Sequence, residues 1–84
     1  MISTNYIVSD TAVKIYQTGN ATNRIYVRAT GSHVFLGGAG VTDVNGLKLD
    51  ANTVIEITVD ELETLYAIVS TGTHNVHVLS PNQL

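Results

Sequence analysis

The sequence has no cysteine and no tryptophan, a single proline, and only 13% charged residues. Without cysteine, the fold is held neither by disulfide bonds nor by a cysteine-containing zinc site. Charged residues make up roughly a quarter of ordinary soluble domains. Here Thr, Ser and Asn supply the polar surface instead, and these residues lose less free energy than Lys or Glu when another protein covers them. The composition therefore favours self-association, with a weakly charged monomer as the alternative.

Basic residues are also scarce. Four Lys and Arg stand against seven Asp and Glu, for a net charge of −3, whereas nucleic-acid binding requires clustered positive charge. The first ten residues have neither the basic nor the apolar region of a signal peptide. The longest apolar run, residues 65–69, is too short to cross a bilayer. We expect a protein made in a cytoplasm, with neither nucleic acid nor a membrane as partner.

Short β-branched and alternating runs separated by turn residues fill the chain. Their spacing of about 8–12 residues predicts an all-β single domain, a small antiparallel β-sandwich or barrel of six to seven short strands. The expected strands are residues 11–16, 23–30, 34–36, 47–49, 53–59, 64–70 and 73–79. Residues 1–10 are either an edge strand or an N-terminal arm, and Pro81 is expected to end the last strand before a tail at 82–84.

Two hairpins are expected between consecutive strands. The turn at Gly31-Ser32 would join strand 23–30 to strand 34–36, and the turn at Thr71-Gly72 would join strand 64–70 to strand 73–79. Residues 60–69 are ambiguous, because their apolar residues also fit the i, i+3, i+4, i+7 pattern of a helix. The β-branched end of this segment favours a turn at 60–63 followed by a strand.

The stretch His33–Leu49 contains the strongest turn signals. We expect a strand leaving one sheet, a glycine corner, a tight turn at Asn45-Gly46, and entry into the next strand at Leu47. The structural turn residues are Gly37, Gly38, Gly40, Asn45 and Gly46.

Residue spacing supports no enzymatic site. The glycine run lacks the Lys-Ser/Thr pair of a phosphate loop, and the acidic residues at 43 and 50 lack the remaining ligands of a calcium loop. His74 and His77 have opposite parity on a strand and would point to opposite faces. No serine is spaced with a histidine and a carboxylate as nucleophilic catalysis requires. We therefore expect no enzyme activity, no cofactor and no metal.

Exposed aromatic and basic residues form a candidate interface. Tyr16 and Tyr26 are expected on the outward faces of adjacent strands, with Arg24 and Arg28 on either side of Tyr26. Such residues are either ordinary cross-strand packing with cation–π contact or a binding surface, because Tyr and Arg are enriched among interface hot spots.

Several of these segments together resemble a pattern found in small virion proteins of tailed bacteriophages. The matching residues are Phe35-Leu36-Gly37-Gly38, Val41-Thr42, Asn45-Gly46-Leu47, Leu49 and Leu65-Tyr66-Ala67, within residues 25–79. Where the pattern commonly has glycine before Leu65, this chain has Asp60-Glu61-Leu62-Glu63.

The resemblance implies a non-enzymatic structural protein. It implies a capsid decoration (cement) protein that binds the assembled head at the capsid surface and stabilises it. The major capsid protein would be its partner, and a homotrimer about a three-fold position its expected form. The alternative is a tail, fibre or receptor-binding module that recognises carbohydrate through Tyr16, Tyr26 or Phe35.

Overall fold

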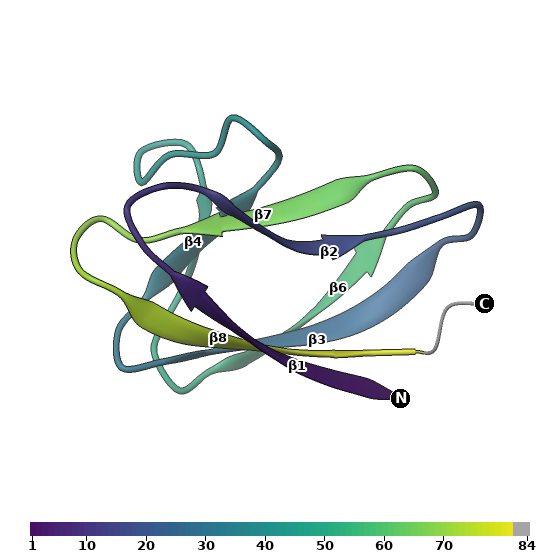
Figure 1. Cartoon of the computed structure of the whole chain (residues 1–84), viewed down its shortest axis with the longest axis horizontal. Coiled ribbons are helices and arrows are strands. Elements are labelled where there is room, and N and C mark those ends of the chain that lie inside the picture. Colours follow the sequence, from purple (N-terminus) through teal and green to yellow (C-terminus); the bar gives the residue numbers. More distant parts are fainter. Residues whose placement is uncertain (82–84) are drawn as a thin grey trace.

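The structure, a computed structural model, describes residues 1–81 and consists of eight strands, with no helix in that range that could cross a membrane (Figure 1). In chain order the strands are β1 (Ile2–Val8), β2 (Val13–Gln17), β3 (Asn23–Thr30), β4 (Val34–Gly37), β5 (Leu47–Leu49), β6 (Val54–Val59), β7 (Thr64–Ile68) and β8 (His74–Ser80). The first sheet has the order β1-β8-β3-β6 and the second the order β2-β7-β4-β5. The expected tail at 82–84 lies outside the described residues.

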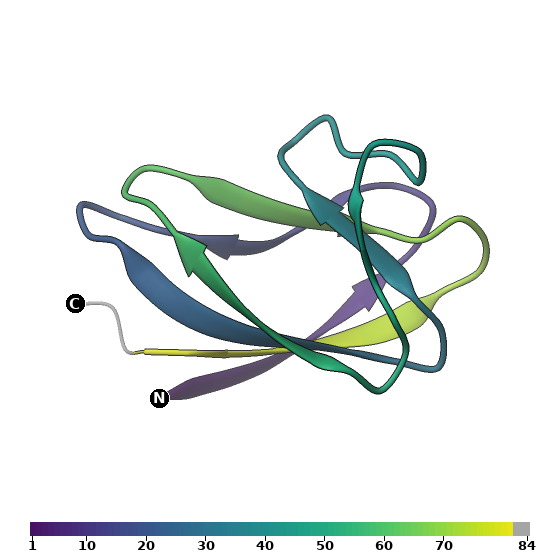
Figure 2. The ribbon, with the colours of Figure 1, turned by 180° about the vertical axis from the view of Figure 1, so that it is seen from behind.

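The two sheets stack face to face, so the prediction of a small antiparallel β-sandwich is confirmed (Figures 1 and 2). It has eight strands rather than six or seven. The additional strand is β1, because residues 2–8 pair along their whole length with β8, from Ile2 opposite Ser80 to Val8 opposite His74. In this chain the segment is therefore an edge strand of its own sheet, and it does not project as an arm.

The strand pairs are nested around the middle of the chain: β1 pairs with β8, β2 with β7, β3 with β6, and β4 with β5. This is an eight-stranded jelly roll. Both predicted hairpins are wrong. β3 and β4 lie in different sheets, as do β7 and β8, because each turn carries the chain across the sandwich to the opposite sheet.

The core consists of aliphatic side chains that alternate along the strands. On β3 the buried residues are Ile25, Val27 and Ala29, as the period of two predicts. The buried core cluster as a whole comprises Val8, Ile15, Ile25, Val27, Ala29, Val34, Leu36, Leu49, Val59, Leu65, Ala67, Val69, Val76 and Val78. None of its members is aromatic, and this suits a thin sandwich whose sheets approach closely. Tyr6 and Tyr16 pack against this cluster while remaining partly exposed, and Tyr26, Phe35 and Tyr66 lie on the outer faces.

Residues 60–63 form a turn, and the helical alternative for 60–69 is wrong, because β7 begins at Thr64. The turn is tied to the β2–β3 loop. The buried Thr18 hydroxyl donates to the carbonyl oxygens of Asp60 and Glu63 and accepts from the Glu63 N–H. Leu62 N also donates to Gly19 O at 2.9 Å. These bonds join the two turns into one rigid end of the sandwich.

Replacing Thr18 by valine tests this connection. Valine preserves the shape of the side chain but leaves the Glu63 N–H and the Asp60 carbonyl without their hydroxyl partner. We expect the free energy of unfolding to fall by about 1–3 kcal/mol. Denaturant titration of Thr18→Val measures the effect, and Thr22→Val, an exposed threonine of the same loop, is the control. Equal stability of the two variants would contradict this role.

Candidate functional site

The glycine-rich segment lies at the apex of the nested strands. It connects β4 to β5, which pair with each other in the second sheet. The expected passage from one sheet to the next is therefore wrong at this point. Of the glycines in the described residues, only Gly31 and Gly72 have a positive φ, so Gly37, Gly38, Gly40 and Gly46 are not required for a left-handed backbone.

Side-chain hydrogen bonds close this loop instead. Asn45 Oδ1 accepts from Thr42 N at 2.7 Å, and Thr42 Oγ1 accepts from the N–H groups of Val44 and Asn45 at 3.2 Å each. Gly46 N donates to Thr42 O at 3.0 Å. The Val41-Thr42 and Asn45-Gly46 pairs thus build a loop that its own hydrogen bonds close.

Close packing explains two of the glycines. The buried side chain of Val41 packs against the backbone of both Gly37 and Gly46. A Cβ on Gly46 would lie 2.7 Å from Phe35 Cβ, 2.9 Å from Thr42 O and 2.9 Å from Val41 Cγ2. A side chain at this position would push the loop away from the sheet.

We therefore expect Gly46→Ala to lower the free energy of unfolding by about 1–3 kcal/mol, because the added methyl overpacks the loop. Thermal unfolding provides the measurement. Gly38→Ala is the matched control. A Cβ there meets nothing within 4 Å and φ is not positive, so its effect should stay within about 0.5 kcal/mol. A tolerated Gly46→Ala would mean that the loop is looser than its contacts indicate.

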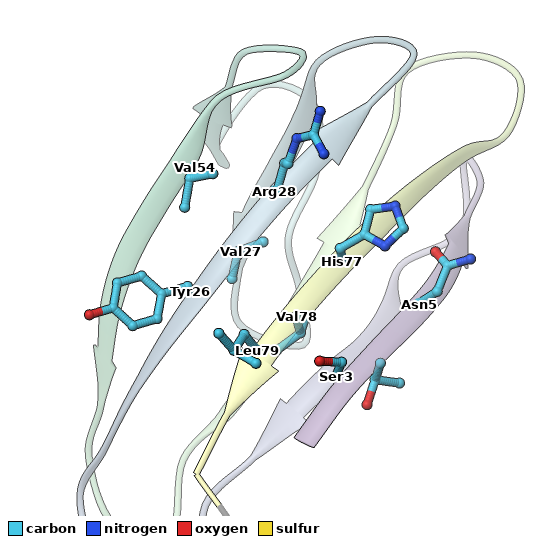
Figure 3. A pocket seen from close by; sticks show the side chains of 10 residues that line it. Ser3, Asn5, Tyr26, Val27, Arg28, Val54, His77, Val78 and Leu79 are labelled. Atoms are coloured by element: carbon cyan, nitrogen blue, oxygen red, sulfur yellow. The ribbon is translucent and has the colours of Figure 1, made fainter. Parts of the chain in front are cut away.

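The outer face of the first sheet contains a shallow hollow of about 420 Å³ (Figure 3). Strand register places Tyr26 opposite Leu79 and Arg28 opposite His77 on the neighbouring strands β3 and β8. Val54 of β6 lies opposite Arg28, and Figure 3 shows these side chains projecting from the three neighbouring strands β6, β3 and β8. Tyr26 remains 37% exposed. The hollow therefore combines an aromatic ring, aliphatic groups and the guanidinium of Arg28.

The charges on this face are only partly paired. Arg24 Nε lies 3.3 Å from Glu56 Oε1, and both side chains are at least half exposed, so the pair contributes about 1 kcal/mol or less. Within residues 1–81, Arg28 has no carboxylate at ion-pair distance. The hollow thus presents one guanidinium that the described chain does not neutralise.

Three of the four predicted interface residues, Arg24, Tyr26 and Arg28, share this face, and their binding role stays a prediction. Tyr16 does not join them. It lies on β2 in the other sheet, where a β-bulge between Lys14 and Tyr16 shifts the register. The bulge turns Tyr16 towards the inner side, where it packs against the core next to Tyr6. It lines a second hollow, between β1 and β2 at the edge of the sandwich.

The outer face of the second sheet carries half-buried aromatic and aliphatic side chains that the sequence analysis missed as a group. Phe35 lies opposite both Ile68 and Lys48, while Tyr66 lies opposite Lys14 and beside Gly37. The signal is visible in the sequence, since these strands are apolar at successive positions, so both of their faces are apolar. The sandwich therefore has an aromatic group with a neighbouring cation on each outer face.

The turn at 60–63 has an unusual conformation at its tip. Leu62 has φ +60° and is 75% exposed, a combination of left-handed backbone and exposed leucine that costs about 1–2 kcal/mol in backbone strain. Its neighbours in the chain, Asp60, Glu61 and Glu63, are all exposed acidic residues. We call these four residues the acidic tip.

Leu62→Gly should raise the free energy of unfolding by about 0.5–1 kcal/mol. Glycine relieves the strain of the left-handed conformation, at a smaller entropic cost in the unfolded chain. Denaturant titration measures the gain. Leu62→Ala is the control, because alanine keeps the strain and should change stability by less than about 0.5 kcal/mol. A less stable glycine variant would show that the leucine side chain stabilises the turn.

No group of three or more His, Asp or Glu in residues 1–81 is placed to hold a metal ion. What the described residues bring together is a pair of contact faces and a rigid acidic tip. These are features suited to binding other molecules.

No protein-family model matches the chain, and no curated protein matches it. Among solved structures it is similar to a chain of the Bacillus endospore appendages, described as a novel family of disulfide-linked pili. The two chains are 15% identical, with a TM-score of 0.61 over 96% of this chain and 85% of the other. At this identity the similarity supports a shared sandwich fold and nothing more specific.

Proposed function

We propose that this chain is a non-enzymatic structural protein of a tailed-bacteriophage virion, a capsid decoration protein that binds the assembled head and stabilises it. The observation that carries the proposal is the pair of outer faces. Tyr26 with Arg28 on one side, and Phe35 with Tyr66 on the other, give this thin sandwich a binding surface on each side. A domain of this shape fits into a seam between larger proteins.

The phage-like pattern supports the same proposal. Its glycines and the Thr42–Asn45 hydrogen bonds stiffen the apex of the fold, as a protein that reinforces a shell requires. The solved pilus chain provides a precedent for the fold in an assembly, since its printed description is of disulfide-linked pili. This chain has no cysteine, so its assembly would depend on non-covalent contacts alone.

Binding to the assembled shell stabilises it by mass action, because the free subunits lack the complete site. The major capsid protein is the proposed partner, and a homotrimer about three-fold positions is the proposed form. The chain would be made in the host cytoplasm and carried on the capsid surface.

The proposal predicts that purified virions carry this chain in hundreds of copies. Adding the purified protein to heads that lack it should raise the temperature at which the heads disrupt, in a saturable manner. Quantitative gel analysis and thermal disruption of the heads provide the two measurements. A handful of copies per particle, or heads whose disruption temperature does not change, would rule out the decoration role.

The hollow around Tyr26 supports a second candidate, a tail or fibre module that binds carbohydrate. An exposed ring beside donor side chains is able to stack on and hydrogen-bond to a sugar. Saturable glycan binding that Tyr26→Ala abolishes, together with low copy number in the virion, would favour this alternative over decoration.

A further inference from the structure

Two groups of surface side chains have no ion-pair or packing role that the described part of the chain accounts for. The first is the acidic tip, where Leu62 is 75% exposed in a strained backbone conformation. Such strain persists only where the surroundings hold it, and it is frequent at functional sites. The second is the hollow on the outer face of the first sheet, with the unpaired Arg28 next to Tyr26 and Leu79.

The chemistry of the two features is complementary. An exposed aliphatic side chain flanked by carboxylates faces solvent at the tip, while the hollow offers aliphatic and aromatic walls around a guanidinium. Insertion of Leu62 against Tyr26 and Leu79 would remove apolar surface from water. The same approach would bring the carboxylate of Glu61 towards Arg28, and charge-assisted bonds of this kind are stronger than neutral ones.

The tip is also preorganised for insertion. Thr18 and Gly19 hold the turn through five hydrogen bonds, so binding would order little additional backbone. Within one molecule the two features do not meet, because the turn passes from β6 in the first sheet to β7 in the second, across the end of the sandwich. The hollow lies on the outer face of the first sheet, so a partner must supply the tip (Figures 1 and 3).

We propose that the partner is a second copy of this chain, with the acidic tip of one copy docked in the hollow of the next. The contact is heterologous, because different surfaces meet, so it produces a closed ring where the rotation allows and a filament otherwise. A ring of three would provide the trimer of the decoration proposal. The contact between copies does not depend on whether the ring binds a capsid. A single turn inserted in a shallow hollow would bury less surface than the roughly 1,200 Å² of a standard interface, so we expect a weak contact for a single pair of copies.

Sedimentation velocity of the purified chain, from about 1 µM to about 1 mM, tests the proposal. We expect concentration-dependent self-association that weakens at high salt, since a pair of exposed charges contributes to it. Arg28→Glu and Glu61→Arg should each weaken it by about tenfold or more, because each places like charges together. The double variant R28E/E61R restores opposite charges and should recover most of the association.

Two further variants separate docking from general effects. Asp43→Arg changes the net charge as Glu61→Arg does, at an exposed site of the β4–β5 loop, and should leave association unchanged. Leu62→Gly should weaken association although it makes the fold more stable, so unfolding would not explain the loss. Leu62→Ala should weaken association as well, because it removes the inserted side chain.

Several results would overturn the proposal. These are a chain that stays monomeric up to about 1 mM, an association that ignores Leu62 and Arg28 changes, and an equal loss in Asp43→Arg. Glycan binding in the hollow by a chain that does not self-associate would assign the hollow to sugar instead. Heads decorated by monomers would leave the decoration role in place and still overturn the tip-in-hollow contact.

Discussion

The nested pairing of strands is the constraint on which the rest of the structure depends. Because β1 pairs with β8, β2 with β7 and β3 with β6, each turn except that of the β4–β5 apex must carry the chain from one sheet to the other. The turns therefore span the core at both ends of the sandwich. The buried Thr18, which ties the β2–β3 loop to the β6–β7 turn, is a direct product of this arrangement.

The same pairing decides which side chains become neighbours on the surface. Arg28 and His77 are far apart in the chain but directly opposite each other on β3 and β8, and the hollow exists because of this register. A two-layer sandwich also leaves one face of every strand open to solvent. With a core made only of aliphatic groups, the rings of Phe35 and Tyr26 are displaced to the outer faces, where they are able to contact another protein.

Strand positions and inward-facing residues could be predicted from the sequence because both depend on local alternation. Residues 23–30 match β3 in full, and the strand at 47–49 matches β5. Sheet membership could not be predicted, since it depends on pairs such as β1 with β8 that no local pattern encodes. Tyr16 shows a second limit: one bulge reverses the face on which a residue lies, and alternation alone cannot reveal it.

The glycine loop was predicted as a turn, and glycine suits such a segment through either a positive φ or a close approach of the backbone. The close approach applies here, because Phe35, Val41 and Thr42 O leave no room for a methyl on Gly46. A left-handed backbone, which favours glycine, occurs instead at Leu62, within the turn at 60–63 where this chain departs from the phage-like pattern. The strained and exposed Leu62 therefore lies where the pattern commonly has glycine and this chain does not.

The apex loop also has a consequence for how the chain folds. β4 and β5 are the one consecutive pair of named strands that lie in the same sheet, so their hairpin is the natural first step. Each later pair encloses the previous one, so the two strands that it joins lie further apart in the sequence, from β3 with β6 to β1 with β8. The outermost pair, β1 with β8, joins residues 2–8 to residues 74–80. Without β1, β8 would have a free edge on the side away from β3, and an exposed strand edge is a site at which another chain can pair.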